Sequence, residues 1–175
     1  MSAESDCGQT LEFFRFDPCE MVPNNLKLPV VLWPQAVRPG SDASEINELM
    51  ARNGWGGNWT WTVFDYHHFH PNAHEALTVA TGWADLMLGG PKGEIFHVTA
   101  GDTIVLPAGT GHCRIAASSD FNVCGGYPAG QHNYETVRAT DGYSVEMTIQ
   151  IHNLPVPRSD PIFGAEGPLT QIWFD

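Results

Sequence analysis

The segment His68-Phe69-His70, followed by Glu75, constrains the fold of this chain more than any other feature. The two histidines are two positions apart, so on a β-strand both imidazoles point to the same face of a sheet. Glu75 follows a short break at Pro71-Asn72 and is placed to return along a neighbouring strand. We therefore expect a β-fold that brings these three side chains together.

A third histidine, His112, can complete the set from elsewhere in the sheet. It follows the turn sequence Pro107-Ala108-Gly109-Thr110-Gly111. Three neutral imidazoles and one carboxylate suit a divalent first-row transition metal. The sequence thus predicts a metal site formed by His68, His70, Glu75 and His112.

The spacing of these residues resembles the two signature motifs of the cupin superfamily. The first motif is HxH, three or four residues, E, six residues and G. The second is G, five residues, PxG, two residues, H, three residues and N. This chain matches both at all but two positions, with His68, His70, Glu75, Gly82, Gly101, Pro107, Gly109 and His112.

Two positions depart from the family pattern. Thr62 stands where the first motif usually opens with glycine, and Ala116 stands where the second ends with asparagine. Neither position is a metal ligand in the family, so the resemblance still implies a metal site. More loosely, a bacterial YjlB-like subgroup of cupins is similar to this chain over segments 53–57, 65–68, 126–131 and 160–173.

The rest of the sequence agrees with a β-rich fold. Short apolar or alternating segments separated by Gly and Pro turns are typical of a sandwich or barrel. One helix is expected after Asp42, with Ile46, Leu49 and Met50 on one face. The expected strands span residues 11–16, 28–32, 59–70, 75–81, 84–88, 94–99, 103–106, 112–116, 121–125 and 145–151.

We therefore predict an all-β chain with one short N-terminal helix, folded as the cupin double-stranded β-helix, a jelly-roll barrel. The prediction is a single domain over residues 1–175, with a metal-motif core at about 58–128. The tail after Pro155 is expected to be an ordered loop. Cupins commonly pair through their outer sheet and terminal strands, so the resemblance implies a homodimer, and the strand at 11–16 fits such an exchange.

Strand alternation predicts which side chains accompany the metal ligands. Phe64, Leu77 and Val79 are expected as pocket walls, with Tyr66 and Arg114 as polar contacts and candidate catalytic residues. Tyr66 is either a general acid or substrate contact, or an aromatic core residue. Arg114 either anchors a substrate carboxylate or pairs with an acidic residue at the barrel edge.

Several other side chains have expected structural roles, most of them with a functional alternative. His74 faces away from the pocket by alternation and could orient a ligand from behind. Trp55, Trp59 and Trp61 are expected to fill the core or an interface, with sugar stacking as the alternative. Gln131 is expected to stabilise a turn.

Charge and hydropathy exclude several classes of partner. The net charge is −12, from 8 basic and 20 acidic residues, and no Lys/Arg cluster exists. We therefore predict no nucleic-acid partner and no anionic membrane surface. The N-terminus has no signal-peptide pattern, and no apolar run approaches the ~20 residues of a membrane helix. The expected location is the cytoplasm.

The resemblance implies several functions without choosing one. We favour an Fe(II)-dependent dioxygenase acting on a small-molecule substrate, with one divalent transition metal per chain. With Mn, Ni or Zn instead of iron, an isomerase, lyase or decarboxylase is the alternative. A non-catalytic metal-assisted binding protein and a metal-free jelly roll that dimerises are the remaining alternatives.

Overall fold

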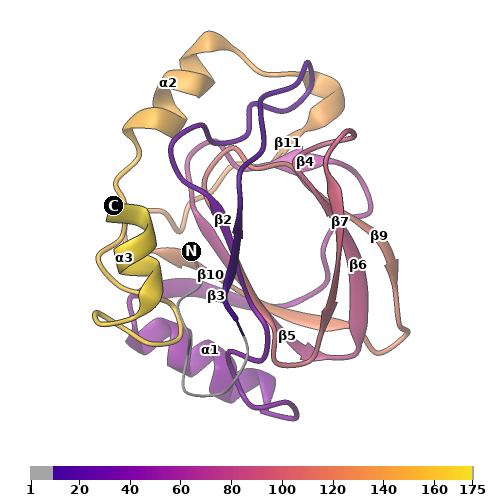
Figure 1. Cartoon of the computed structure of the whole chain (residues 1–175), viewed down its shortest axis with the longest axis vertical. Helices are drawn as coiled ribbons and strands as arrows, with labels where there is room; N and C mark the ends of the chain where they lie inside the picture. Colours follow the sequence, from indigo (N-terminus) through magenta and orange to yellow (C-terminus); the bar gives the residue numbers. More distant parts are fainter. Residues whose placement is uncertain (1–9, 175) are drawn as a thin grey trace.

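The computed structural model describes residues 10–174, which form two antiparallel sheets facing each other (Figure 1). One sheet has six strands in the order β1-β2-β8-β5-β10-β3, and the other has five in the order β11-β4-β9-β6-β7. The strands are β1 Glu12–Phe14, β2 Val30–Trp33, β3 Trp55–Trp61, β4 His68–Phe69, β5 Glu75–Thr81, β6 Trp83–Leu88, β7 Glu94–Thr99, β8 Thr103–Leu106, β9 His112–Ala117, β10 Asn122–Pro128 and β11 Val137–Arg138. The helices are α1 Ala43–Arg52, α2 Val145–Asn153 and α3 Pro168–Phe174, with a 3₁₀ turn at Ala139–Asp141.

A hydrophobic core fills the space between the two sheets. Leu77, Val79 and Ile104 of the six-stranded sheet belong to one buried cluster with Leu86 and Val98 of the five-stranded sheet. Strand alternation supplies this cluster, because every second side chain of β6 points inward. The predicted double-stranded β-helix is confirmed.

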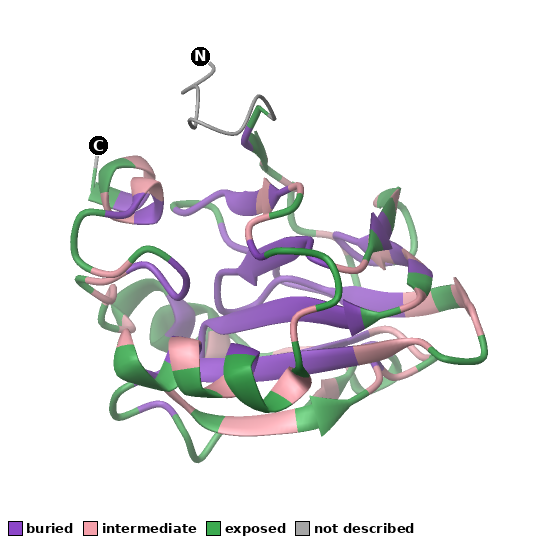
Figure 2. Cartoon of the chain, turned by 90° about the horizontal axis from the view of Figure 1, so that it is seen from below, coloured by how far each residue is buried: buried purple, intermediate pink, exposed green. Residues whose placement is uncertain are grey.

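The six-stranded sheet is also covered on its outer face. There Val105 of β8 and Ala76 of β5 contact a second buried cluster, to which Met50 of α1 and Trp173 of α3 contribute. Because both faces are buried, β5 is buried at every position except its last, and Figure 2 shows this as continuous purple strands. The other sheet lacks this cover at β7, whose outer residues are exposed.

Helix α1 lies where the sequence predicts it. The Asp42 side chain accepts a hydrogen bond from the backbone N–H of Ser44 and so caps the helix. Ile46 and Met50, four positions apart, are buried against the outer face of the six-stranded sheet. The helix ends at Arg52, next to the C-cap Asn53.

The predicted strand at 145–151 is wrong, because this segment is helix α2. Its apolar residues alternate, which favoured a strand, but Ser144 caps a helix by accepting a hydrogen bond from the N–H of Met147. The helix leaves Val145 and Ile149 exposed and buries Ile151. Local capping therefore outweighed the period-2 pattern. The prediction of a single helix is also wrong, because the tail after Pro155 ends in α3.

The predicted strand at 59–70 is interrupted in the structure. Strand β3 pairs with β10 in the six-stranded sheet, whereas β4 pairs with β9 in the other. The chain therefore leaves one sheet and enters the other at residues 62–67, where no strand is formed. The alternation of side chains between the two faces of a strand, counted backwards from His68, therefore does not apply across this crossing.

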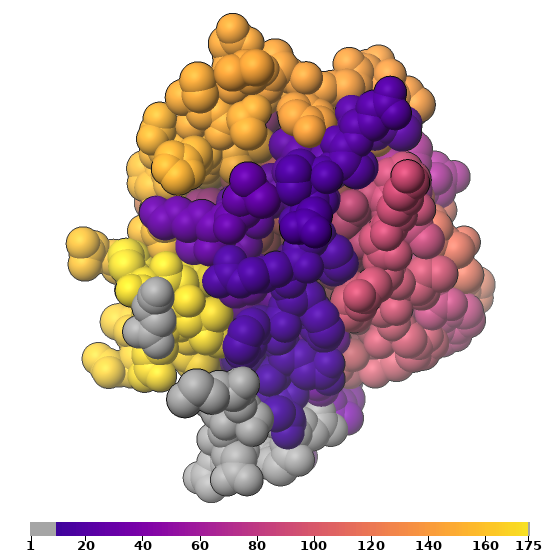
Figure 3. Space-filling model, turned by 45° about the horizontal axis from the view of Figure 1, so that its top comes forward, coloured from indigo at the N-terminus to yellow at the C-terminus, as the bar shows by residue number. Residues whose placement is uncertain are grey.

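The N-terminal strand β1 pairs with β2 of the same chain. Phe14 and Phe16 make edge contacts with Phe96 of β7, at ring-centroid distances of 4.7 and 6.4 Å. In Figure 3 this indigo segment lies between the yellow C-terminal helix and the pink strands. The homodimer stays a prediction.

No helix within residues 10–174 has the length and apolar character needed to cross a membrane. Cys19, Cys113 and Cys124 carry free thiols.

Candidate metal centre

Three strands place the predicted metal ligands at one end of the barrel. His68 is the first residue of β4 and lies directly across from His112, the first residue of β9. Glu75 is the first residue of β5 in the opposite sheet. His70 follows β4, and its carbonyl accepts the N–H of Gly109. The structure thus brings together all four residues that the sequence predicts.

Backbone carbonyls fix the orientation of all three imidazoles. The Nδ1 atoms of His68, His70 and His112 lie 2.9, 2.8 and 2.9 Å from the carbonyl oxygens of Tyr66, Glu135 and Thr110. Since a carbonyl only accepts, each Nδ1 carries the proton and donates. In the neutral rings the lone pair is therefore on Nε2, the nitrogen left free to bind a metal.

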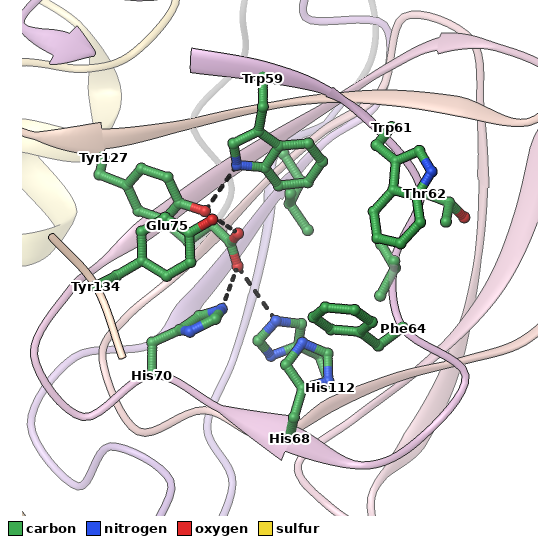
Figure 4. Close-up of a pocket in the computed structure, with 12 residues that line it drawn as sticks. Trp59, Trp61, Thr62, Phe64, His68, His70, Glu75, His112, Tyr127 and Tyr134 are labelled. Carbon is green, nitrogen blue, oxygen red and sulfur yellow. Dashed lines mark hydrogen bonds and ion pairs between the residues drawn. The ribbon is translucent and has the colours of Figure 1, made fainter. Parts of the chain in front are cut away.

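The candidate ligand atoms lie close to one another. One ligand nitrogen from each of His68, His70 and His112 lies within 4.8 Å of the others. Glu75 Oε2 lies 3.3 Å from His70 Nε2 and 3.2 Å from His112 Nε2, as the dashed lines of Figure 4 show. All four side chains are buried. The three histidines could therefore hold a metal ion, with Glu75 adjacent as a fourth ligand.

The electrostatics of this cluster favour a cation. Burial, followed by repulsion from His112, lowers the pKa of His68 to about 2, so its ring is neutral. Burial also opposes charge on His70, but attraction to the Glu75 carboxylate outweighs it and raises the pKa of His70. Burial likewise opposes charge on Glu75, and the neighbouring His70 and His112 keep its pKa well below the usual range.

Within the part of the chain that the structure describes, Glu75 Oε2 is a buried oxygen without a hydrogen-bond partner. Its two histidine neighbours approach through Nε2, which is unprotonated in the neutral rings, so the carboxylate faces lone pairs rather than donors. A buried carboxylate in this position needs a positive charge, supplied either by a proton on His70 or by a metal ion. The donor set therefore fits a divalent transition metal.

The turn before His112 is tightly fixed. Gly109 has a φ of +88°, and a Cβ there would lie 2.6 Å from the carbonyl oxygen of Asn24, so only glycine fits. The N–H of Ala108 donates to His74 Nδ1 over 2.9 Å. Burial lowers the pKa of His74 to about 4, which keeps that nitrogen an acceptor. His74 thus faces away from the ligands and holds the turn.

A cavity of about 280 Å³ opens onto the four predicted metal ligands. Phe64 and Leu77 line it as predicted, whereas Val79 lies deeper in the core between the sheets. The lining residues are Trp59, Trp61, Thr62, Val63, Phe64, His68, His70, Glu75, Leu77, His112, Tyr127 and Tyr134.

Tyr66 and Arg114 lie next to this cavity but do not line it. Tyr66 stacks on Phe64 with ring centroids 4.8 Å apart, and the Arg138 guanidinium lies 3.8 Å from the centre of its ring. Arg114 donates from Nη1 to Thr62 Oγ1 over 2.9 Å. Both residues therefore contact the cavity walls from behind, and their catalytic roles stay predictions.

Two tyrosines of the site were missed by sequence reasoning. Tyr127 donates its O–H to Glu75 Oε1 over 3.0 Å and accepts the indole N–H of Trp59 over 2.8 Å. Burial and the Glu75 charge raise the pKa of Tyr127, so it remains a donor. Tyr134 stacks on Tyr127 at 4.2 Å. Tyr127 lies in segment 126–131, which resembles the YjlB-like subgroup, but the pairing of β10 with β3 and β5 is what brings it to Glu75.

Trp55 and Gln131 have structural roles. Trp55 is fully buried and donates its indole N–H to the carbonyl of Ser159. The Gln131 side chain accepts the N–H of His74 and donates to the carbonyl of Pro155. It thereby joins the turn at the end of β10 to the tail, as expected of a turn-stabilising residue.

Comparison with known proteins supports these observations. A family model described as "Cupin" matches residues 66–149. The uncharacterized protein YjlB of Bacillus subtilis is 36% identical over 153 residues, which cover 87% of this chain and 90% of that protein.

Solved structures are more distant. Acireductone dioxygenase from Bacillus anthracis, with a cadmium ion in its active centre, is 17% identical with a TM-score of 0.37, covering 51% of this chain and 60% of that one. An uncharacterized protein with a double-stranded β-helix domain from Klebsiella pneumoniae is 19% identical with a TM-score of 0.37, covering 67% and 74%. Similarity this low establishes neither a shared reaction nor a shared ligand.

Proposed function

We propose, on the premise that this chain belongs to the cupin family and is YjlB-like, that it is a mononuclear metal enzyme acting on a small organic molecule. The reaction that we favour is an Fe(II)-dependent dioxygenation. The observation that carries the proposal is the convergence of three imidazoles and the Glu75 carboxylate at the base of a largely apolar cavity.

The proposed ligands are His68, His70, Glu75 and His112. A divalent iron held by these residues would supply redox chemistry with dioxygen. The side chains of this chain supply the rest. The three imidazoles are held in one orientation by backbone carbonyls, so little reorganisation is needed on binding.

The cavity walls support this chemistry in two ways. Apolar side chains such as Val63, Phe64 and Leu77 exclude water from the ligands. Tyr127 occupies Glu75 Oε1, so that Oε2 alone is directed at the histidines. Tyr127 therefore acts as a positioning residue for the carboxylate.

Oxygen uptake tests the proposed reaction. We expect iron-loaded protein to consume dioxygen in step with substrate loss when it is given a panel of catechols, enols and hydroxyketones, and zinc-loaded protein to consume none. The reason is that zinc has no redox chemistry, although it suits the same ligands. An oxygen electrode and chromatography of the substrate measure both quantities.

Other outcomes of the oxygen-uptake experiment would favour one of the alternative functions. Substrate conversion without oxygen uptake by either metal form would contradict dioxygenation and favour an isomerase, lyase or decarboxylase. Saturable binding without conversion would favour a binding protein.

Replacing Tyr127 by phenylalanine is expected to weaken metal binding about 10- to 100-fold, the usual effect of removing a group that orients a ligand. The change deletes one hydroxyl, which leaves Glu75 Oε1 without its donor and Trp59 without its acceptor. Competition with a chromophoric chelator measures the Kd for Zn²⁺.

The matched control is Tyr143→Phe, which removes a hydroxyl bonded to the carbonyl of Cys19 and keeps the edge contact of its ring with Phe69. Its zinc Kd should equal that of the wild type. Equal weakening in both variants would show that Tyr127 has only a general structural role.

A further inference from the structure

We propose that the cavity takes a flat, uncharged aromatic molecule that carries one metal-chelating group. The inference of a chelating group rests on the proposed metal function. The inference of an aromatic part rests on the cavity walls alone. Three features of the walls lead to this substrate class: their shape, their hydrogen bonds and their charge.

Aromatic rings surround the open part of the cavity. Figure 4 shows Trp59, Trp61 and Phe64 around one side of it, with Glu75 and the histidines on the other. Trp61 and Phe64 meet edge to face at 5.8 Å and 83°. Rings arranged this way offer faces and edges against which a further ring packs.

The size of the cavity limits the molecule. A cavity of about 150 Å³ is enough to hold benzene, and this one has about 280 Å³. One or two rings with a chelating substituent therefore fit within it. Trp61 is 60% exposed, which places it at the opening, where a bound ring would cover it.

The polar groups of the walls are largely bonded to one another. The indole N–H of Trp59 is used by Tyr127, and the hydroxyl of Tyr127 is used by Glu75. The Thr62 oxygen already accepts from Arg114. A sugar, which needs many hydrogen bonds to replace those with water, would find few partners here. This disfavours the sugar-stacking alternative for Trp59 and Trp61.

Charge disfavours small diacids. Within residues 10–174, no lysine or arginine lines the cavity, and Glu75 is the one acidic residue that does. The Arg114 guanidinium donates to Thr62 and is not among the lining groups of the described residues. A dicarboxylate would bring two negative charges into an apolar space with no cationic side chain to neutralise the second.

A pair of chelators that differ by one ring tests the inference. Cobalt-loaded full-length protein is titrated calorimetrically with benzohydroxamate and acetohydroxamate, which share the same chelating group. We expect benzohydroxamate to bind at least about tenfold tighter, because its ring packs against the aromatic walls. Trp61→Ala should remove most of this difference and leave the acetohydroxamate Kd unchanged.

Trp83→Ala is the control, because Trp83 is an exposed tryptophan of β6 that packs at a tilt against His97 and does not line the cavity. It should behave as wild type. Equal Kd values for the two hydroxamates, or tighter binding of oxalate than of benzohydroxamate, would overturn the inference.

Two separate measurements distinguish failure of the proposed metal function from failure of the aromatic-ligand inference. Cobalt content is determined first, and a chain that takes up no cobalt contradicts the proposed function. The metal-free chain is then titrated with 2-naphthol, which needs no metal. Saturable binding that is weakened in Trp61→Ala would support the aromatic class without the metal, and no saturable binding would overturn it.

Discussion

Elemental analysis of protein purified without an affinity tag is expected to find one divalent transition metal per chain, and none in the His70→Ala variant. Removing His70 deletes one of three converging nitrogens and leaves the buried Glu75 carboxylate without its main source of positive charge. We expect the affinity to fall by more than about 100-fold, beyond the usual effect of changing a group that only orients a ligand.

The affinity for the metal is expected to fall as the pH is lowered. In the metal-free protein Glu75 raises the pKa of His70, so at lower pH this ring is protonated. The metal must displace that proton, and its affinity should therefore fall by about tenfold per pH unit below the raised pKa and level off above it. Zinc titrations at several pH values measure this slope.

His97→Ala provides the matched control for metal content. His97 is exposed on β7 and pairs with Asp85 at 2.7 Å, away from the ligands. Its metal content should equal that of the wild type. If the wild type binds no stoichiometric metal even after reconstitution, the four residues are a relic of the fold, and the metal-free alternative gains support.

Replacing Asp160 by alanine is expected to lower the free energy of unfolding by about 3 to 5 kcal/mol. The Asp160 carboxylate is fully buried and accepts the backbone N–H groups of Ile162, Phe163 and Leu169, at 2.8, 3.0 and 3.2 Å. Alanine would leave all three donors without a partner in a buried segment. Urea denaturation followed by tryptophan fluorescence measures the change.

The loss of stability in Asp160→Ala should affect more than the C-terminal tail, because the tail packs on the core. Leu169 and Trp173 belong to the cluster that covers the six-stranded sheet, and the Trp173 indole donates to the carbonyl of Pro29. The control is Asp141→Ala, at an exposed aspartate, which should change stability by less than about 0.5 kcal/mol. Similar losses in both variants would contradict the role given to Asp160.

The local parts of the site were predictable from the sequence. His68 and His70 lie two apart, and the turn before His112 has its own signature, so these features depend on neighbouring residues alone. Tyr127 was not predictable, because its contact with Glu75 depends on β10 pairing with β5, and no local pattern encodes which strands pair. The positions of Tyr66 and Arg114 depend likewise on the crossing at 62–67 and on the register shift in β9.

The distribution of the ligands over the two sheets has a consequence for the amount of folded protein. Glu75 belongs to the six-stranded sheet, whereas His68 and His112 belong to the five-stranded sheet. An ion held by this set would cross-link the two halves of the barrel and would bind the folded chain in preference to the unfolded one. At a free concentration 100 times its Kd, such an ion adds about 2.7 kcal/mol to stability. The cellular lifetime of the chain would then follow the supply of its metal.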